Sequence, residues 1–379
     1  MKDEMRKSTY RVKVKKCSSK KEMQPQKVHS KAKEGQREIV IKLPLLSKLE
    51  SKVNETVIGQ EDVVRAVCTK VYEGIIFPVI KGNILIVGKS GTGKTEIVKQ
   101  IANNLKFPLT IEDATSYTQE GYIGASVIDM IYNIISAANG NIELAKRGII
   151  FIDEIDKKVN SEGMISDISK GDVLKSLLKI MEGTIIRLEN PLYYLNPEVE
   201  KPTIPFDTSS LIFIFGGAFE GLDKIKEKRL KADSKIGFSF PKENTIVTNN
   251  YSKTSFTKQD LIEYGLPSEF VGRISNIYET NNLSEEDLTK ILKFSKKSIF
   301  RRYENILIAS GIKLEYPDDL FYKIAQNAHK YPTGARELNS YVSYMFERIM
   351  YDVLNGKVDS KKCVLEEGII SNNRQFHWE

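Results

Sequence analysis

Short apolar runs set the hydrophobic pattern of the first two thirds of this chain. They cover residues 83–88, 148–153 and 211–215, and their length suits strands that are buried on both faces. The first run leads directly into residues 96–102, whose apolar side chains recur at helical spacing. Strands followed by helices in this way predict an α/β domain with a parallel sheet.

From residue 283 onward the pattern becomes helical. Ser284 is the expected N-cap of a helix on which Leu288, Ile291 and Leu292 share one face. The further elements expected in this part are a short strand, a helix and a last segment, at residues 312–316, after Pro317 and at residues 336–354. They predict a small α-rich domain.

Length and composition agree with this division. The 379 residues are 41% hydrophobic, enough for a substantial core. We expect a tail at residues 1–38, a large α/β domain at 39–280 and a small α-rich domain at 281–379. No apolar run reaches the length of a membrane span, and the N-terminus has no hydrophobic region of the signal-peptide kind, so a cytoplasmic protein is expected.

The cysteines add little chemistry. Cys17, Cys68 and Cys363 lie far apart and form no CxxC pair. This spacing argues against a zinc knuckle and against a disulfide framework.

The net charge of +7 is concentrated at the N-terminus. Residues 1–37 hold 13 Lys and Arg against 4 Asp and Glu, which leaves 44 basic and 46 acidic residues in the rest of the chain. With few apolar residues and no period, this tail is predicted to be disordered. It is the one candidate for contact with RNA or an acidic partner, although a solvated tail without a specific ligand is the favoured interpretation.

The strongest chemical signal is a P-loop between the first strand and its helix. It reads GKSGTGKTE and consists of Gly88, Lys89, Ser90, Gly91, Thr92, Gly93, Lys94, Thr95 and Glu96. In such a loop backbone N–H groups surround the phosphates of ATP, Lys94 reaches the β- and γ-phosphates, and the Thr95 hydroxyl binds Mg²⁺. The strand-to-helix context makes a chance match improbable.

An acidic pair ends the second apolar run. Asp153 is expected in the Mg²⁺ shell, and Glu154 is expected to orient and activate the attacking water. An apolar strand that ends in Asp-Glu is common by itself. About sixty residues after a P-loop, however, it favours ATP hydrolysis over nucleotide binding alone.

At this point the motifs resemble those of ClpX, a family of AAA+ protein unfoldases. In the family's order, over roughly residues 53–355, they are VIGQ at 57–60, the P-loop, DAT at 113–115, GYIG at 121–124, IDEID at 152–156, LLKIMEG at 177–183, FGGAF at 215–219, LPSEFVGR at 266–273 and TGAR at 333–336. The related HslU unfoldases share the nucleotide motifs but match FGGAF less well. The resemblance implies an AAA+ large domain followed by a small lid.

The resemblance gives a role to an exposed pair of one aromatic and one aliphatic residue. Taken alone, Gly121, Tyr122, Ile123 and Gly124 would be a surface turn with its aromatic side chain folded onto the protein. In ClpX-like rings this loop faces the axial channel and its aromatic side chain grips the polypeptide. A bulky side chain on a flexible arm suits a contact that must accept any sequence.

The resemblance also completes the ATP site. It implies that Arg273 is an arginine finger that reaches the neighbouring subunit, that Arg336 is a sensor arginine of the small domain, and that Val57 and Ile58 line the adenine pocket. A surface salt bridge would be the ordinary interpretation of either arginine alone. A finger acting in trans implies a ring, here a homohexamer.

A polar segment at residues 231–257 contains the tripeptide Ile236, Gly237 and Phe238. Exposed apolar side chains in a polar loop require a hydrophobic partner or an anchor on their own domain. In ClpX this tripeptide docks on the ClpP peptidase ring, so a ClpP-type partner is expected.

Three departures from the ClpX pattern limit what is carried over. The N-terminus has one cysteine, so the family's four-cysteine zinc-binding domain is expected to be absent and adaptor recognition is in doubt. Residues 188–201 are acidic and aromatic where the family has an Arg-Lys-His loop, which puts recognition of tags with a free carboxylate in doubt. Gly216 and Gly217 follow the third apolar run, so no polar sensor is assigned there.

Three functions therefore compete. They are an ATP-driven unfoldase that feeds polypeptide substrates to a ClpP-type peptidase, a remodelling ATPase without a peptidase, and a nucleotide-dependent module or nucleic-acid motor. The acidic pair and the finger argue against a passive module, and the near-neutral body lacks the basic stripe of a nucleic-acid motor. The Ile-Gly-Phe tripeptide favours the first function over the second.

Overall fold

The computed structural model describes residues 43–78, 81–117, 126–159, 168–189, 203–235, 255–331, 333–356 and 358–379. The predicted basic tail, the predicted pore loop at residues 121–124, the tripeptide at residues 236–238 and most of the segment at residues 188–201 lie outside the described residues. Among the described residues, no helix combines the length and apolar character needed to cross a bilayer.

The helices and strands in chain order are α1 (Leu46–Asn54), α2 (Glu61–Ile76), β1 (Asn83–Val87), α3 (Lys94–Leu105), β2 (Leu109–Asp113), η2 (Ala114–Ser116), α4 (Asp129–Ala137), α5 (Ile142–Ala145), β3 (Ile149–Asp153), η3 (Ile155–Lys158), α6 (Ile168–Met181), β4 (Ile185–Glu189), β5 (Thr203–Asp207), β6 (Ile212–Gly217), α8 (Leu222–Lys235), α10 (Lys258–Tyr264), α11 (Ser268–Arg273), β7 (Ile274–Glu279), α12 (Glu285–Phe294), α13 (Ile299–Ala309), β8 (Lys313–Glu315), α14 (Leu320–His329), α15 (Ala335–Leu354), β9 (Lys362–Leu365), η4 (Glu367–Ile370) and β10 (Phe376–Trp378).

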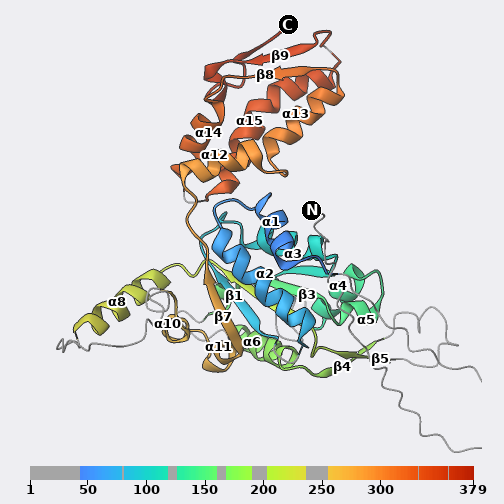
Figure 1. Ribbon diagram of the computed structural model, residues 1–379, viewed down its shortest axis with the longest axis vertical. Coiled ribbons are helices and arrows are strands. Elements are labelled where there is room, and N and C mark those ends of the chain that lie inside the picture. The colour runs from blue at the N-terminus through green and yellow to red at the C-terminus, as the bar shows by residue number, and fades with distance from the viewer. Residues whose placement is uncertain are drawn as a thin grey trace, which may run out of the picture.

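A five-stranded sheet in the order β2-β3-β6-β1-β7 organises the large domain (Figure 1). Every pairing in it is parallel. The predicted α/β fold with a parallel sheet is therefore confirmed. Strand β1, at the position of the first apolar run, lies between β6 and β7.

Helices cover both faces of this sheet. On β1, Ile84 and Ile86 belong to a core shared with α1, α2 and α3. Leu85 and Val87 point to the opposite face and belong to a second core, which α4, α6, α10 and α11 complete. Because both faces are buried, the strand is continuously apolar and shows no alternation with polar residues.

The carboxyl ends of β1, β3 and β6 meet at one edge of the sheet because the strands run in parallel. The P-loop follows β1, the pair Asp153 and Glu154 ends β3, and Ala218 follows β6. Segments that are about 130 residues apart in sequence are thus brought to one site.

The small domain lies above the large one in Figure 1 and has its own core. Ser284 caps α12 in a reciprocal capping box with Asp287, and Leu288 and Leu292 of that helix are buried. Helices α12 to α15 pack beside a three-stranded sheet in the order β10-β9-β8. The sequence predicted only the first of these strands, β8.

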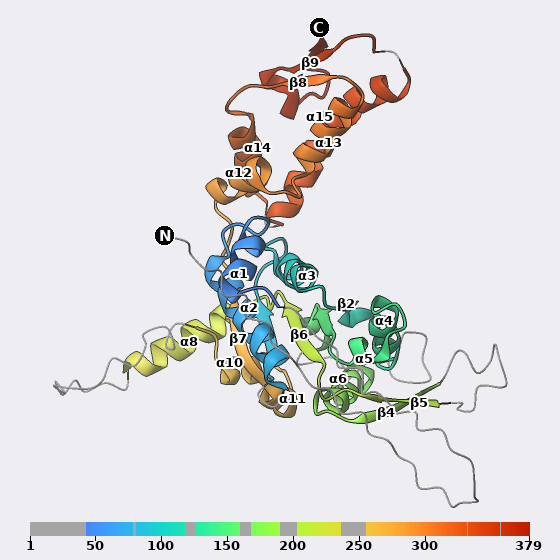
Figure 2. The same ribbon diagram turned by 45° about the vertical axis from the view of Figure 1, so that its right-hand side comes forward.

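One predicted loop boundary is wrong. Helix α8 continues to Lys235, so the segment predicted as a loop from residue 231 begins as helix. Its sequence, LDKIKEKRLKADSK, has five Lys with one Arg and one Glu, residues that favour helix, and few apolar residues. Figures 1 and 2 both show α8 projecting from the large domain.

An ion pair with a buried carboxylate fastens α8 to α10. Arg229 donates to both carboxylate oxygens of Asp260 at 2.8 and 3.0 Å, and the side chain of Asp260 is 1% exposed. Asp260 also caps its own helix together with Thr257. Burial acts to raise the pKa of Asp260, but hydrogen bonds from Arg229 and Thr257 outweigh this effect and lower the pKa below its ordinary value.

Replacing Asp260 by Ala should destabilise the large domain by about 2–3 kcal/mol, because the partly buried guanidinium of Arg229 loses its carboxylate and α10 loses its capping box. Thermal or urea unfolding measures this loss. Since the pKa of Asp260 is lowered on folding, its contribution is present above the unfolded-state pKa of about 4 and declines as the pH falls below it. The exposed pair of Lys228 and Glu263 joins the same helices, so Glu263→Gln is the matched control and should cost under about 0.5 kcal/mol. Equal losses for both variants would contradict this account.

Candidate functional site

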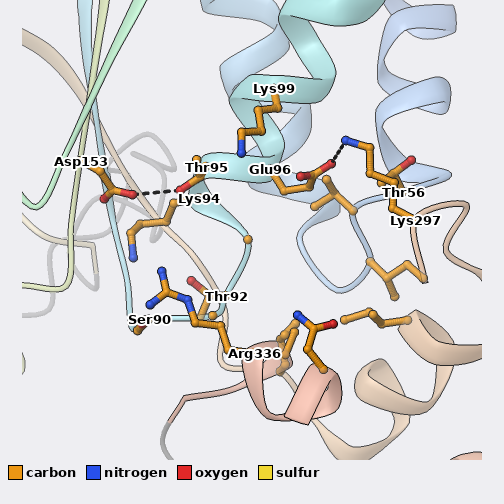
Figure 3. A pocket seen from close by; sticks show the side chains of 18 of the residues that line it. Thr56, Ser90, Thr92, Lys94, Thr95, Glu96, Lys99, Asp153, Lys297 and Arg336 are labelled. Atoms are coloured by element: carbon orange, nitrogen blue, oxygen red, sulfur yellow. Dashed lines mark hydrogen bonds and ion pairs between the residues drawn. The ribbon is translucent and has the colours of Figure 1, made fainter. Parts of the chain in front are cut away.

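A cavity lined by described residues lies between the large and small domains (Figure 3). It has a volume of about 780 Å³, within the usual range for a small-molecule site. The large domain contributes most of the P-loop, the ends of β3 and β6, and residues 56–58. The small domain contributes residues from α12, α13 and the start of α15.

The P-loop places its charged lysine inside this cavity. Lys94 begins α3, is 8% exposed, and its ammonium donates to the carbonyls of Gly88 and Lys89, the latter at 3.0 Å. Burial lowers the pKa of Lys94, and the carboxylate of Asp153 opposes this shift. Gly93 precedes the helix in the left-handed region at φ 101°, a conformation that favours glycine. The loop thus presents a helix N-terminus and a cation to the same space.

The first turn of α3 is joined to the end of β3. The Thr95 hydroxyl donates to Oδ2 of Asp153 at 2.9 Å (Figure 3). A hydroxyl and a carboxylate form the oxygen donor set that Mg²⁺ prefers. These residues therefore fit a magnesium ion that accompanies a bound nucleotide.

Glu154 has an unusual backbone. Its φ of 57° lies in the left-handed region, which few non-glycine residues adopt, and it lines the cavity. Such a conformation costs about 1 kcal/mol or more and is often found at functional sites. The backbone N–H of Glu154 donates to Oδ1 of Asp153 at 3.0 Å, which fixes the turn between the two acids.

The small domain contacts the P-loop directly. The N–H of Ala335, at the start of α15, donates to the carbonyl of Gly91 at 3.3 Å. Arg336 follows and lines the cavity on the same side as Ser90 (Figure 3). Any rotation of the small domain therefore acts on the loop that would hold phosphates.

An apolar wall completes the cavity. Val57 is 4% exposed and Ile58 is partly buried, and across from these residues of the large domain the small domain supplies Leu283 and Ile291. These side chains suit the flat, apolar faces of a nucleobase.

Comparisons with known proteins agree with this geometry. Residues 80–277 match the model of an AAA domain family (Cdc48 subfamily). The "ATP-dependent Clp protease ATP-binding subunit ClpX" of Borrelia duttonii (strain Ly) is 35% identical over 345 residues, which are 87% of this chain and 80% of that protein. The chain belongs to the ClpX family of AAA+ ATPases.

Two further ClpX proteins are similar to nearly the same extent. The ClpX of Treponema denticola is 34% identical over 347 residues, 87% of this chain and 82% of that protein. The ClpX of Bacteroides thetaiotaomicron is 32% identical over 337 residues, 86% of this chain and 81% of that protein. The predicted ClpX resemblance is confirmed, and the chain is an ATP hydrolase that binds nucleotide.

The cavity brings together most of the ATP-site residues predicted from the ClpX motifs. Its lining contains Ser90 to Glu96, Val57, Ile58, Asp153, Glu154 and Arg336. Gly88 and Lys89 are instead the carbonyl partners of Lys94. Their roles toward ATP stay predictions.

Arg273 lies elsewhere. It ends α11, its side chain is half exposed, and its guanidinium forms an ion pair with Glu182. It does not belong to the lining of the cavity between the two domains. The predicted role in a neighbouring ClpX-type subunit stays a prediction.

Several lining residues were not predicted. Asp156 is buried, accepts from the N–H of Phe219 at 3.1 Å through Oδ2, and has no partner for Oδ1 among the described residues. Its place in IDEID was the available signal. No polar residue was assigned after the third apolar run, yet Glu220, beyond β6, lines the cavity, as does Lys297 of the small domain. No local pattern marks these last two.

Gly91→Ala should weaken the contact between the domains. Gly91 has a φ of 78°, and an added Cβ would lie 2.0 Å from the carbonyl oxygen of Thr333. We expect a loss of stability of about 2 kcal/mol or more and a weaker affinity for nucleotide, because the small domain must move away from the loop. Thermal unfolding and titration with a fluorescent ATP analogue measure the two effects.

Gly311→Ala is the matched control for this strain. Gly311 has nearly the same φ, 79°, but its added Cβ would meet no atom within 4 Å. The Gly311→Ala variant should lose about 1 kcal/mol of its free energy of unfolding and keep the nucleotide affinity of the wild type. If the two variants behave alike, the contact between Gly91 and the small domain has no consequence for the site.

Proposed function

We propose that this chain is an ATP-driven protein unfoldase that threads polypeptides through the pore of a homohexameric ring, in the cytoplasm, into a ClpP-type peptidase. The observation that carries the proposal is the meeting of a P-loop, an acidic pair and a small-domain arginine in one cavity between two domains. The relatives' names, as ATP-binding subunits of a Clp protease, support the peptidase as partner.

In the proposed reaction, the residues around the P-loop have different roles. Lys94 binds the β- and γ-phosphates, while Thr95 and Asp153 hold Mg²⁺, which neutralises developing negative charge when bound. Glu154 orients the attacking water and takes its proton. The hydrogen bond from Thr95 to Asp153 and the fixed turn at Glu154 pre-position these groups.

Hydrolysis becomes movement because the nucleotide site is shared between domains. Arg336 approaches the phosphates from the small domain, and Ala335 is bonded to the loop through Gly91. Losing the γ-phosphate removes a charge that holds Arg336, so the angle between the domains changes. Arg273, half exposed outside its own cavity, acts on the ATP of the adjacent subunit.

Tyr122 and Ile123 grip the polypeptide in the axial channel. The described residue directly before this loop segment, Tyr117, accepts a hydrogen bond at 2.8 Å from Lys158 through its carbonyl. Lys158 ends η3, which begins directly after Glu154. This contact supports a short physical route from the acid that activates water to the base of the gripping loop.

Docking on the peptidase uses Ile236, Gly237 and Phe238. These residues follow the end of α8, and α8 projects from the large domain in both views (Figures 1 and 2). By its composition, such an apolar tripeptide suits a hydrophobic cleft on a partner ring. Burying its two large side chains would contribute about 3–6 kcal/mol.

Lys94→Ala should abolish nucleotide binding, whereas Glu154→Gln should retain binding and lower turnover about 10³-fold or more, because the water loses its base. Nucleotide titration and steady-state phosphate release separate the two effects. Normal turnover in Glu154→Gln would remove Glu154 from its assigned role.

Mixed rings test the position of Arg273. Subunits with Arg273→Ala, combined with Glu154→Gln subunits, should recover part of the turnover, since some interfaces then pair an intact arginine with an intact glutamate. No recovery in rings shown to be mixed would place the arginine outside the neighbouring site.

Tyr122→Ala should keep ATP hydrolysis within a few-fold of normal but fail to unfold a stable substrate, because truncation removes the apolar area that resists slippage. Degradation of an already unfolded substrate with a ClpP-type peptidase should suffer less. Phe238→Ala is the complementary control, which should keep unfolding but lose delivery to the peptidase. Unfolding that survives in Tyr122→Ala would refute the gripping role.

A further inference from the structure

The loop between α12 and α13 joins the two domains at one edge of the nucleotide cavity. The Ser295 hydroxyl donates to the carbonyl of Thr56 at 3.2 Å. Lys296 forms an ion pair with Glu55. Lys297 Nζ lies 2.7 Å from Oε1 of Glu96. Ser295 with Thr56 and Lys297 with Glu96 both join pairs of cavity-lining residues, and of these two contacts only the second is an ion pair.

Glu96 brings a negative charge close to the predicted phosphate site. It follows Thr95 in the first turn of α3, beside the place where the P-loop holds phosphates. The same oxygen that contacts Lys297 also accepts from Nε2 of Gln100 at 2.6 Å, one turn further along the helix. Gln100 is 8% exposed, so it fixes the carboxylate from the protein side while Lys297 holds it from the other domain.

Figure 3 shows this pair on a different side of the cavity from Arg336 and Ser90. The small domain is therefore attached at two edges, through Lys297 to the helix α3 and through Ala335 to Gly91. Two separated attachments define an angle between the domains, which one attachment alone leaves free.

We propose that Lys297 and Glu96 form a latch between the domains that positions the small domain over α3 and neutralises Glu96, so that a nucleoside triphosphate can be held beside it. The proposal deepens the function proposed above and rests on nucleotide binding in this cavity. Glu96 and Lys297 are positioning residues in it, and neither needs to touch the nucleotide.

The physical reason is electrostatic. A carboxylate next to a polyphosphate repels it, and a cation at 2.7 Å offsets this repulsion. The side chains of Lys297 and Glu96 are 42% and 33% exposed, so in the open cavity water screens the pair and its effect is modest. A ligand that fills the cavity displaces that water and strengthens the pair, which couples nucleotide binding to the domain angle.

A double-mutant cycle on the full chain tests the latch by titration with a fluorescent ATP analogue. Lys297→Met should weaken binding about three- to tenfold, because Glu96 is then left unpaired beside the phosphates. Glu96→Gln should change the affinity for the analogue less than Lys297→Met does. The double variant Glu96→Gln with Lys297→Met should bind better than Lys297→Met alone, since the repelling charge has been removed.

A second measurement does not depend on nucleotide. Amide hydrogen exchange at residues 295–298 of the free protein should speed up in Lys297→Met and return toward the wild-type rate in the charge swap Glu96→Lys with Lys297→Glu. Lys323→Met breaks a similarly exposed ion pair with Asp319, remote from the cavity, and is the control that should leave binding and this exchange unchanged.

Three results would overturn the latch. Additive losses in the cycle, with no recovery in the double variant, would mean that Lys297 contacts the nucleotide directly. Binding within twofold of wild type in Lys297→Met would mean an ordinary surface pair. Unchanged exchange at residues 295–298 would show that the pair does not hold the loop. In each case wild-type protein that binds ATP leaves the proposed ATP site intact, so failure of the latch is distinct from failure of the proposed function.

Discussion

The parallel pairing of β1 with β6 and β7 decides where the chemical groups of this protein lie. Backbone hydrogen bonds align Val87 with Gly217 on one side and with Glu279 on the other. Each of these residues ends its strand, so the segments that follow leave the sheet together. A shift of β1 by one residue would exchange its two buried faces and also move the P-loop away from Asp153.

The same edge of the sheet carries the connection to the small domain. Just beyond β7, the side chain of Gln60 donates to the carbonyl of Asn281 and accepts from its N–H, both at 2.8 Å. Gln60 is fully buried, so this reciprocal pair anchors the chain where it passes between domains. With the chain anchored at Asn281, the loop before α13 and the start of α15 are held close enough to line the cavity.

Local patterns were sufficient to predict the features that depend on few neighbouring residues. The strand before the P-loop, the acidic end of β3 and the Ser284 cap each depend on residues that are adjacent or one turn apart. Strand β8 was predicted because residues 312–316 alternate apolar with polar, whereas KCVL of β9 does not alternate and FHW of β10 spans only three residues.

Contacts between segments that are distant in sequence could not be predicted from local patterns. Thr92 and Thr280 share a hydrogen bond at 2.8 Å across 188 residues, and Lys297 meets Glu96 across 201. Each of these residues alone looks like an ordinary polar side chain. The partners come together only when both domains have folded and packed against each other, and this packing depends on the whole chain.

The bond between Arg229 and Asp260 has a mechanical meaning for the large domain. Helix α8 projects from the large domain (Figures 1 and 2). Without a contact to a neighbouring element, a force on its far end would act on α8 alone. The bidentate pair near its middle ties α8 to α10, whose Leu261 is fully buried in the core. A load applied beyond Lys235 is therefore passed in part through this ion pair to α10 and its buried Leu261, and is not carried by α8 alone.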